Sequence, residues 1–119
     1  MSEPLDCLPD PPYYAVIFTS RRALGNDEAY AEVAERMHAL ASRQPGFLGL
    51  TSLRNADDVG VTVSYWSDAL SMANWRRHVE HRIAQEQGKR LFYEEYRLEV
   101  CRVERTAQHP PQQQGEIKK

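Results

Sequence analysis

The sequence has few cysteines, no long apolar run and no excess of charge of either sign. Cys7 and Cys101 are the only cysteines among 119 residues, too few for a disulfide-stabilised scaffold. No apolar stretch approaches the roughly 18 residues of a membrane-spanning helix, and the N-terminal segment lacks the apolar core of a signal peptide. Glycine-rich phosphate loops and CxxC motifs are also missing. We therefore expect a soluble, cytoplasmic protein with reduced thiols and no membrane partner.

Proline is nearly absent from the middle of the chain. Six of the seven prolines lie close to the two ends, and only Pro45 lies between them. This distribution predicts a flexible proline-rich segment over residues 1–12, one folded domain over 13–105 and a disordered tail over 106–119. The domain carries 13 basic and 13 acidic residues, so its net charge is zero. Because binding to a phosphate backbone requires a basic surface, we expect no nucleic-acid partner.

Hydrophobic periodicity divides the domain into six elements. Strict alternation over residues 59–66 is typical of a half-buried strand, and the apolar residues that follow Asn26 recur at the spacing of one helix face. The segment 91–96 fits a helical turn as well as a strand. The predicted strands cover residues 13–20, 47–54, 59–66 and 98–105, and the predicted helices run from Asn26 to Gln44 and from Ser67 to about Gly88.

The order β-α-β-β-α-β predicts an α+β, ferredoxin-like fold, in which a four-stranded antiparallel sheet carries two helices on one face. The opposite face of the sheet is then uncovered, yet the first strand is apolar on both sides. One side carries Tyr13, Ala15 and Ile17, and the other carries Tyr14, Val16 and Phe18. Because an apolar face of this kind requires burial, the sequence predicts a homodimer.

Three segments resemble the antibiotic biosynthesis monooxygenase (ABM) family: PGFLGL at 45–50, TVSYW at 62–66, and a helix with a tryptophan at Trp75. A pattern of one subgroup, W…EH..AQ..G…WY..Y, is also similar, although Phe92 replaces its second tryptophan. The resemblance spans about residues 13–105. It implies a dimeric α/β barrel, in which two ferredoxin-like sheets face each other, and monooxygenase chemistry that needs no cofactor.

Two branches of that family differ from this chain at positions that carry their chemistry. The quinone-forming monooxygenases place an asparagine four residues before the strand-end tryptophan and a tyrosine six residues after it. Here Trp66 is retained, but the other positions hold Thr62 and Met72. In the haem-degrading branch, a histidine ten residues after the helix tryptophan binds iron, and the matching residue here is Gln85. The resemblance therefore favours neither of these reactions in its usual form.

His78 and His81 are the candidate catalytic residues. Residues 78 and 85 project within about 20° of each other on a helix, beside the apolar stripe, so His78 and Gln85 lie close to a buried surface. An imidazole there can accept a phenolic or enolic proton, which activates an electron-rich ring toward O₂. In the alternative interpretation, these histidines only stabilise the helix end. Two histidines at this spacing do not make a metal site, so no metal is expected. His38 is predicted to be exposed on the first helix.

Aromatic residues are concentrated in the C-terminal half of the domain. Together with Gln85, four of them are candidate substrate-binding residues, namely Tyr65, Trp75, Tyr93 and Tyr96. The alternative is ordinary core or dimer packing, which is the favoured interpretation for Trp66. Cys101 is predicted to be a buried, inert thiol, and Arg21 and Arg22 to be isolated surface charges.

The preferred hypothesis is an ABM-type, cofactor-independent monooxygenase, or a related enzyme, that acts on a small aromatic or polyketide-like molecule. One alternative is a non-catalytic dimeric barrel that binds a small apolar ligand or acts in stress. The other is a haem-binding member of the family with altered iron ligation. All three are compatible with the same fold, because a fold does not determine a function.

Overall fold

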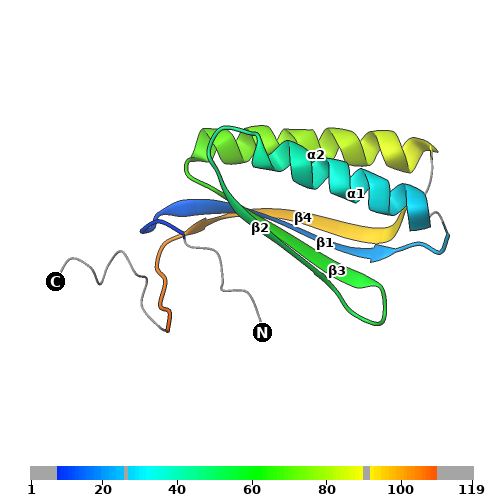
Figure 1. Cartoon of the computed structure of the whole chain (residues 1–119), viewed down its shortest axis with the longest axis horizontal. Coiled ribbons are helices and arrows are strands. Elements are labelled where there is room, and N and C mark those ends of the chain that lie inside the picture. Colours follow the sequence, from blue (N-terminus) through cyan, green and yellow to red (C-terminus); the bar gives the residue numbers. More distant parts are fainter. Residues whose placement is uncertain (1–7, 26, 90–91, 110–119) are drawn as a thin grey trace.

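The computed structural model describes residues 8–25, 27–89 and 92–109 (Figure 1). The predicted element order is confirmed. The elements are β1 (Tyr13–Arg22), α1 (Asp27–Ser42), β2 (Phe47–Arg54), β3 (Val59–Trp66), α2 (Ala69–Lys89) and β4 (Tyr93–Val103). Among the described residues, neither helix combines the length and apolar character that a membrane crossing requires. Most of the predicted flexible ends, 1–12 and 106–119, lie outside the described residues, and so does the helix-capping position Asn26.

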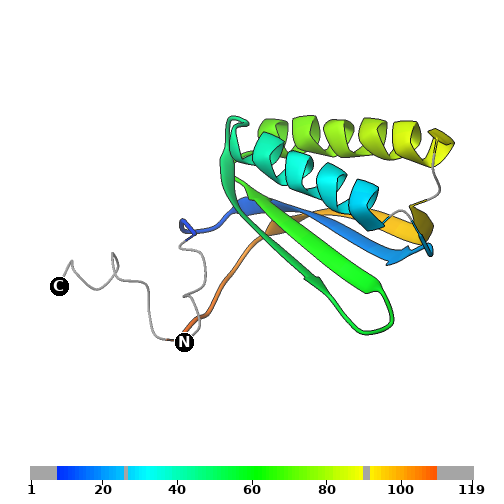
Figure 2. The ribbon, with the colours of Figure 1, turned by 45° about the vertical axis from the view of Figure 1, so that its right-hand side comes forward.

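The four strands form one antiparallel sheet in the order β2-β3-β1-β4, and both helices cover the same face of it (Figures 1 and 2). The predicted α+β, ferredoxin-like fold is therefore confirmed. Val16 of β1 pairs with Ser64 on β3 and with Val100 on β4, and these three residues share the helix-covered face. Segment 91–96, which the sequence left ambiguous, belongs to β4 from Tyr93 onward.

Two stacked tryptophans attach α2 to the sheet. Trp66 at the end of β3 is completely buried, and Trp75 of α2 stacks on it with ring centroids 5.6 Å apart and an angle of 27° between the ring planes. Val16 and Ala41 complete this buried cluster, so that it joins both helices to the sheet. The prediction that Trp66 is a packing residue is confirmed. At the start of α2, a carboxylate oxygen of Asp68 accepts a hydrogen bond from the backbone N–H of Ser71 (2.8 Å), which holds the pKa of Asp68 below its usual value.

The sheet face that points away from the helices is apolar and partly exposed. Leu53 of β2 and Val61 of β3 pair across strands on this face, and they are 73% and 37% exposed. Cys101 is exposed on the same face, so the prediction of a buried thiol is wrong. The predicted alternation of side chains along β4 is correct. The sequence does not reveal which face of this edge strand the helices leave uncovered.

Gly46, which links α1 to β2, has no room for a side chain. Its φ is +83°, and a Cβ atom there would lie 2.6 Å from the Cβ of Ser71 at the start of α2. Gly25 has a similar φ of +89°, but a Cβ there would meet nothing within 4 Å. An alanine at Gly25 therefore carries only the free-energy cost of a left-handed backbone, whereas an alanine at Gly46 adds a steric overlap with α2.

We predict that Gly46→Ala lowers the free energy of unfolding more than Gly25→Ala does. The Gly25 variant carries only the left-handed backbone cost of about 1–2 kcal/mol. The Gly46 variant adds an overlap that α2 must shift to relieve, for a total of roughly 2–4 kcal/mol. Urea unfolding followed by circular dichroism measures both. Equal losses would show that the contact between Gly46 and α2 is not tight.

Candidate functional site

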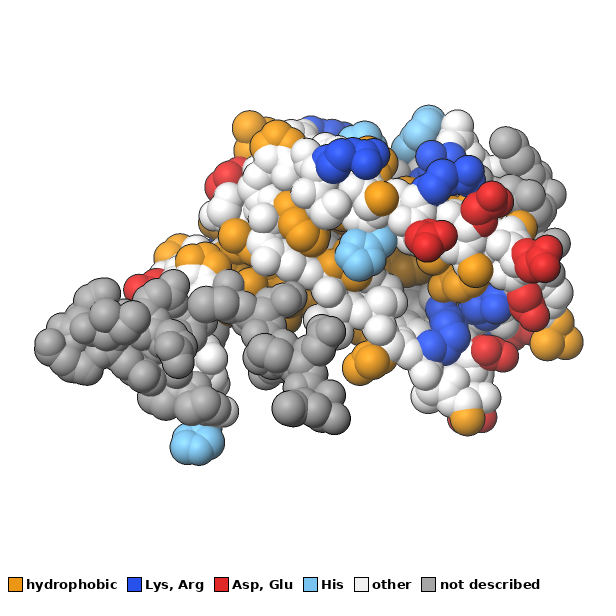
Figure 3. All heavy atoms as spheres, in the orientation of Figure 1, with side chains coloured by type: hydrophobic (Ala, Val, Ile, Leu, Met, Phe, Trp, Pro, Cys, Tyr) orange, Lys and Arg blue, Asp and Glu red, His pale blue; other side chains and the backbone are white. Residues whose placement is uncertain are grey.

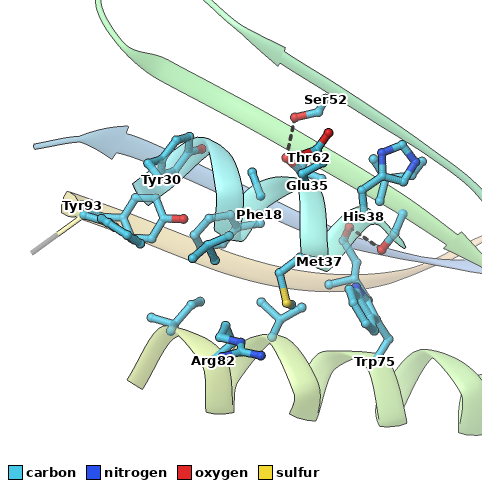
Figure 4. Close-up of a pocket in the computed structure, with 18 residues that line it drawn as sticks. Phe18, Tyr30, Glu35, Met37, His38, Ser52, Thr62, Trp75, Arg82 and Tyr93 are labelled. Carbon is cyan, nitrogen blue, oxygen red and sulfur yellow. Dashed lines mark hydrogen bonds between the residues drawn. The ribbon is translucent and has the colours of Figure 1, made fainter. Parts of the chain in front are cut away.

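A cavity of about 340 Å³ lies between the two helices and the sheet (Figure 4). All six elements contribute side chains to its lining, and most of the lining is apolar. This size and composition suit a small organic molecule. In Figure 3, apolar side chains are set back among charged ones below the helices, on the face that Figure 1 views.

The cavity exists because every residue that follows Trp66 on the same face of β3 is small. On the helix-covered face this strand carries Trp66, Ser64, Thr62 and Gly60 in succession. The stacked indoles of Trp66 and Trp75 fill the space under α2 at one end. Beyond them, the two hydroxyl residues are too small to reach the helices, and both line the cavity. The change from large to small residues therefore sets where packing ends and the cavity begins.

Three hydroxyl-bearing residues of β2 and β3 line the sheet side of this cavity, beside apolar strand residues. The Oγ of Ser52 and the Oγ1 of Thr62 share a cross-strand hydrogen bond of 2.8 Å, which engages one of their two hydroxyl protons (Figure 4). Ser64 is buried, and its Oγ accepts a hydrogen bond from the indole N–H of Trp66 (2.9 Å) while donating to the carbonyl of Val16 (3.5 Å). Ser64 thus holds Trp66 in place, and the Ser52–Thr62 pair offers polar contact to a ligand.

His38 of α1 lies at the same end of the cavity as Trp75 (Figure 4). The sequence predicted His38 to be exposed, which is correct, but it also belongs to the cavity lining. One feature of the sequence indicates this place in the lining: His38 directly follows Met37, at the edge of the apolar stripe of α1. Among the described histidines, His38 is the one that lines the cavity, and it brings a titratable imidazole to the edge of an apolar space.

The opposite end of the cavity, which we term the tyrosine end, consists of Tyr30, Phe92 and Tyr93. The rings meet edge to face, with centroids 5.7 Å apart for Tyr30–Phe92 and 6.0 Å for Tyr30–Tyr93. The guanidinium of Arg54 donates a hydrogen bond of 2.7 Å to the hydroxyl of Tyr30. Burial, and secondarily the neighbouring Tyr30 hydroxyl, raises the pKa of Tyr93 well above its usual value, so its hydroxyl stays protonated.

The structure brings some of the sequence-predicted site residues to the cavity and places others elsewhere. Trp75 and Tyr93 line it. His78, His81 and Gln85 are exposed on α2 and do not belong to the lining, although the His78 ring lies 5.7 Å from the Trp75 ring.

Two of the predicted tyrosines also lie outside the lining. Tyr65 is on the far face of the sheet, where its ring contacts Tyr13, and Tyr96 is half exposed beside Tyr93. Among the described residues, no group of three or more potential ligands is arranged to hold a metal ion.

The sequence alone did not identify several lining residues. In the sequence, Tyr30 lies on the apolar stripe of the first helix and Glu35 on its polar side, and the structure places both in the lining. Arg82 and Ser52 received no role. Each is an ordinary surface or stripe residue within its own element, and its importance arises only where the elements meet.

Two relatives of known sequence are similar to the chain over most of its length. It is 50% identical over 105 residues to the protein YqjZ of Bacillus subtilis (strain 168), covering 88% of this chain and 91% of that protein. It is 28% identical over 92 residues to "Jasmonate monooxygenase ABM" of Pyricularia oryzae, covering 76% of this chain. The match spans only 43% of the fungal protein's length.

The fold is also that of solved structures at low sequence identity. SnoaB, a cofactor-independent oxygenase from Streptomyces nogalater, superposes with a TM-score of 0.59 at 20% identity, covering 87% of this chain and all of that chain. The family model "Antibiotic biosynthesis monooxygenase" matches residues 13–87, which include every strand and helix up to the end of the cavity-lining part of α2. The chain belongs to the antibiotic biosynthesis monooxygenase family.

Proposed function

We propose that the protein is an ABM-type monooxygenase that oxidises a small, largely apolar ring compound inside the cavity. The observation that carries this proposal is the cavity itself, which is apolar, lies between helices and sheet, and has a hydroxyl-bearing wall and one titratable imidazole. The jasmonate monooxygenase and the cofactor-independent oxygenase among the similar proteins support the same class of reaction.

The chemistry that suits such a cavity needs no external reductant. A phenolic or enolisable ring that loses a proton becomes electron-rich enough to react with O₂. When a ring CH₂ becomes a carbonyl, one oxygen atom enters the product and the other leaves as water, so the substrate itself supplies all the electrons. The protein has to exclude bulk water, orient the ring and accept the proton. Trp75 and Tyr93 provide apolar walls against which the ring packs.

His38 is the proton acceptor in this proposal. It lines the cavity at the Trp75 end, within reach of a ring held against the Ser52–Thr62 hydroxyl pair. The assignment of this role to His78 or His81 stays a prediction from the sequence. Those side chains are exposed on α2 and reach a substrate only if it extends out of the cavity.

We predict that His38→Ala lowers oxygen consumption by about 100-fold or more on a panel of hydroxyaromatic substrates, because general-base catalysis contributes at least that factor. His78→Ala and His81→Ala are expected to lower it less, and His109→Ala serves as a matched control on the C-terminal segment. An oxygen electrode measures the rate. A loss confined to the two α2 variants would move the role to α2, and undiminished rates in all three would contradict an imidazole base.

The protein is also proposed to act as a homodimer. The support is the apolar sheet face that the helices leave uncovered, where Leu53 and Val61 are exposed, together with the family to which the chain belongs. A second copy that packs against this face buries both apolar surfaces at once. The substrate cavities lie on the other side of each sheet, between sheet and helices, so each subunit keeps its own.

We predict that the double variant Leu53→Asp/Val61→Glu is a folded monomer, because a charge on this face opposes burial. Leu70→Asp is the matched control, since Leu70 is 69% exposed but belongs to α2. Size-exclusion chromatography with light scattering gives the mass of each. A dimeric double variant, or a wild type that is monomeric at micromolar concentration, would contradict the proposed interface.

A further inference from the structure

Two guanidinium groups flank the ring of Tyr30. The Cζ of Arg22 lies 4.2 Å from the ring centroid, and the Cζ of Arg54 lies 5.4 Å from it. Arg54 also donates to the Tyr30 hydroxyl at 2.7 Å. Arg22 comes from the end of β1 and Arg54 from the end of β2, on either side of β3 in the sheet. Both strands therefore direct a cation to the one tyrosine of α1, at the end of the cavity farthest from His38.

A glycine makes room for this arrangement. Gly60 of β3 is the cross-strand partner of Arg54, and a Cβ atom on Gly60 would lie 2.7 Å from both the Cζ and an Nη atom of that guanidinium. The side chain of Arg54 passes over Gly60 to reach Tyr30, and it also donates to the backbone carbonyl of Asp58. The close approach thus depends on Gly60, the one residue without a side chain on the helix-covered face of β3.

The cluster has more positive than negative charge. Arg22 pairs with the carboxylate of Asp27 at 3.0 Å, but its Nε is buried without a hydrogen-bond partner among the described residues. Arg54 bonds only to a hydroxyl and a carbonyl in the described part of the chain, and it has no carboxylate partner there. Arg22 and Arg54 lie behind Tyr30 and are not lining residues themselves, and the lining residues Glu35 and Arg82 contribute one charge of each sign. An anionic oxygen is what this end of the cavity lacks.

We propose that the tyrosine end binds the carboxylate of an organic acid, so that the ring of the ligand extends toward His38 and Trp75. The Tyr30 hydroxyl accepts from Arg54 and from the Tyr93 hydroxyl, and it keeps its own polarised proton to donate to a carboxylate oxygen. Arg54 acts through Tyr30 as a positioning residue. The inference rests on the proposed function, and it narrows the substrates of that reaction to ring compounds that carry an acid group.

The affinity of the cavity for 2-naphthoate and for its neutral isostere 2-naphthamide tests this proposal. The two probes share one ring system and differ in charge. Quenching of tryptophan fluorescence reports binding, because Trp75 lines the cavity. We expect the wild type to bind the acid at least about tenfold more tightly than the amide, as one charge-assisted hydrogen bond provides. Equal affinities, or no binding of the acid, would overturn the proposal.

Substitutions in the cluster of Tyr30, Arg54 and Gly60 test which groups make the protein prefer the acid to the amide. Tyr30→Phe removes only the hydroxyl, and Arg54→Met removes the guanidinium but keeps the length of the side chain. Gly60→Ala displaces the same guanidinium without changing any lining residue. Each is expected to reduce the ratio of acid to amide affinity by about tenfold, because the charge-assisted part of the hydrogen bond is lost. Arg76→Met, which removes an exposed arginine paired with Glu80 on α2, is the control and should keep the ratio.

An unchanged ratio in Arg54→Met and Gly60→Ala, in variants whose circular dichroism is that of the wild type, would overturn the proposal even if Tyr30→Phe were unstable. The binding measurements involve no turnover. A protein that prefers the acid but consumes no oxygen would contradict the proposed function alone. A protein that oxidises neutral rings and binds the acid no better than the amide would contradict this inference alone.

Discussion

The stacking of Trp66 on Trp75 determines where the rest of the molecule is packed and where it is open. The two indoles, 5.6 Å apart and almost fully buried, fix the distance between α2 and the sheet at one end. Further along β3 the side chains become too small to bridge that distance. Because the helices are stiff, the gap stays open beyond the tryptophans, and a cavity follows from the change from one large to three small residues on one strand face.

The same change gives the two ends of the cavity different chemistry. At the end next to the stacked tryptophans, the cavity is bounded by the indole of Trp75 and by the imidazole of His38. At the tyrosine end, Gly60 leaves room for the Arg54 guanidinium to pass over β3 and contact Tyr30. Hydrogen-bond donors and positive charge are therefore concentrated around Tyr30. A ligand with a reactive ring and an acid group matches this polarity. One strand thus influences packing, ligand orientation and the placement of the proton acceptor.

The sequence predicted the architecture well, because strand alternation and helical periodicity are local patterns. Residues 59–66 alternate strictly, and the structure has a strand over the same residues. The site was harder to predict, because it depends on contacts between elements. His38 is an ordinary exposed helix residue in the sequence, and only the packing of α1 on β2 brings it to the cavity. Arg22 is similar, since it was predicted to be an isolated surface charge, yet its side chain is mostly buried and ion-paired with Asp27.

If the cavity holds the substrate, a side chain that fills the cavity abolishes the reaction. Thr62→Phe places a ring in the open space from the sheet side, where Thr62 lines the cavity. The decisive measurement is oxygen uptake with a hydroxyaromatic acid by this variant, compared with the wild type, alongside the thermal unfolding midpoint of each. We expect uptake to be lost while the midpoint is maintained or raised, because the added ring occupies empty apolar space. Uptake at the wild-type rate by a folded Thr62→Phe protein would place the reaction outside the cavity and contradict the account.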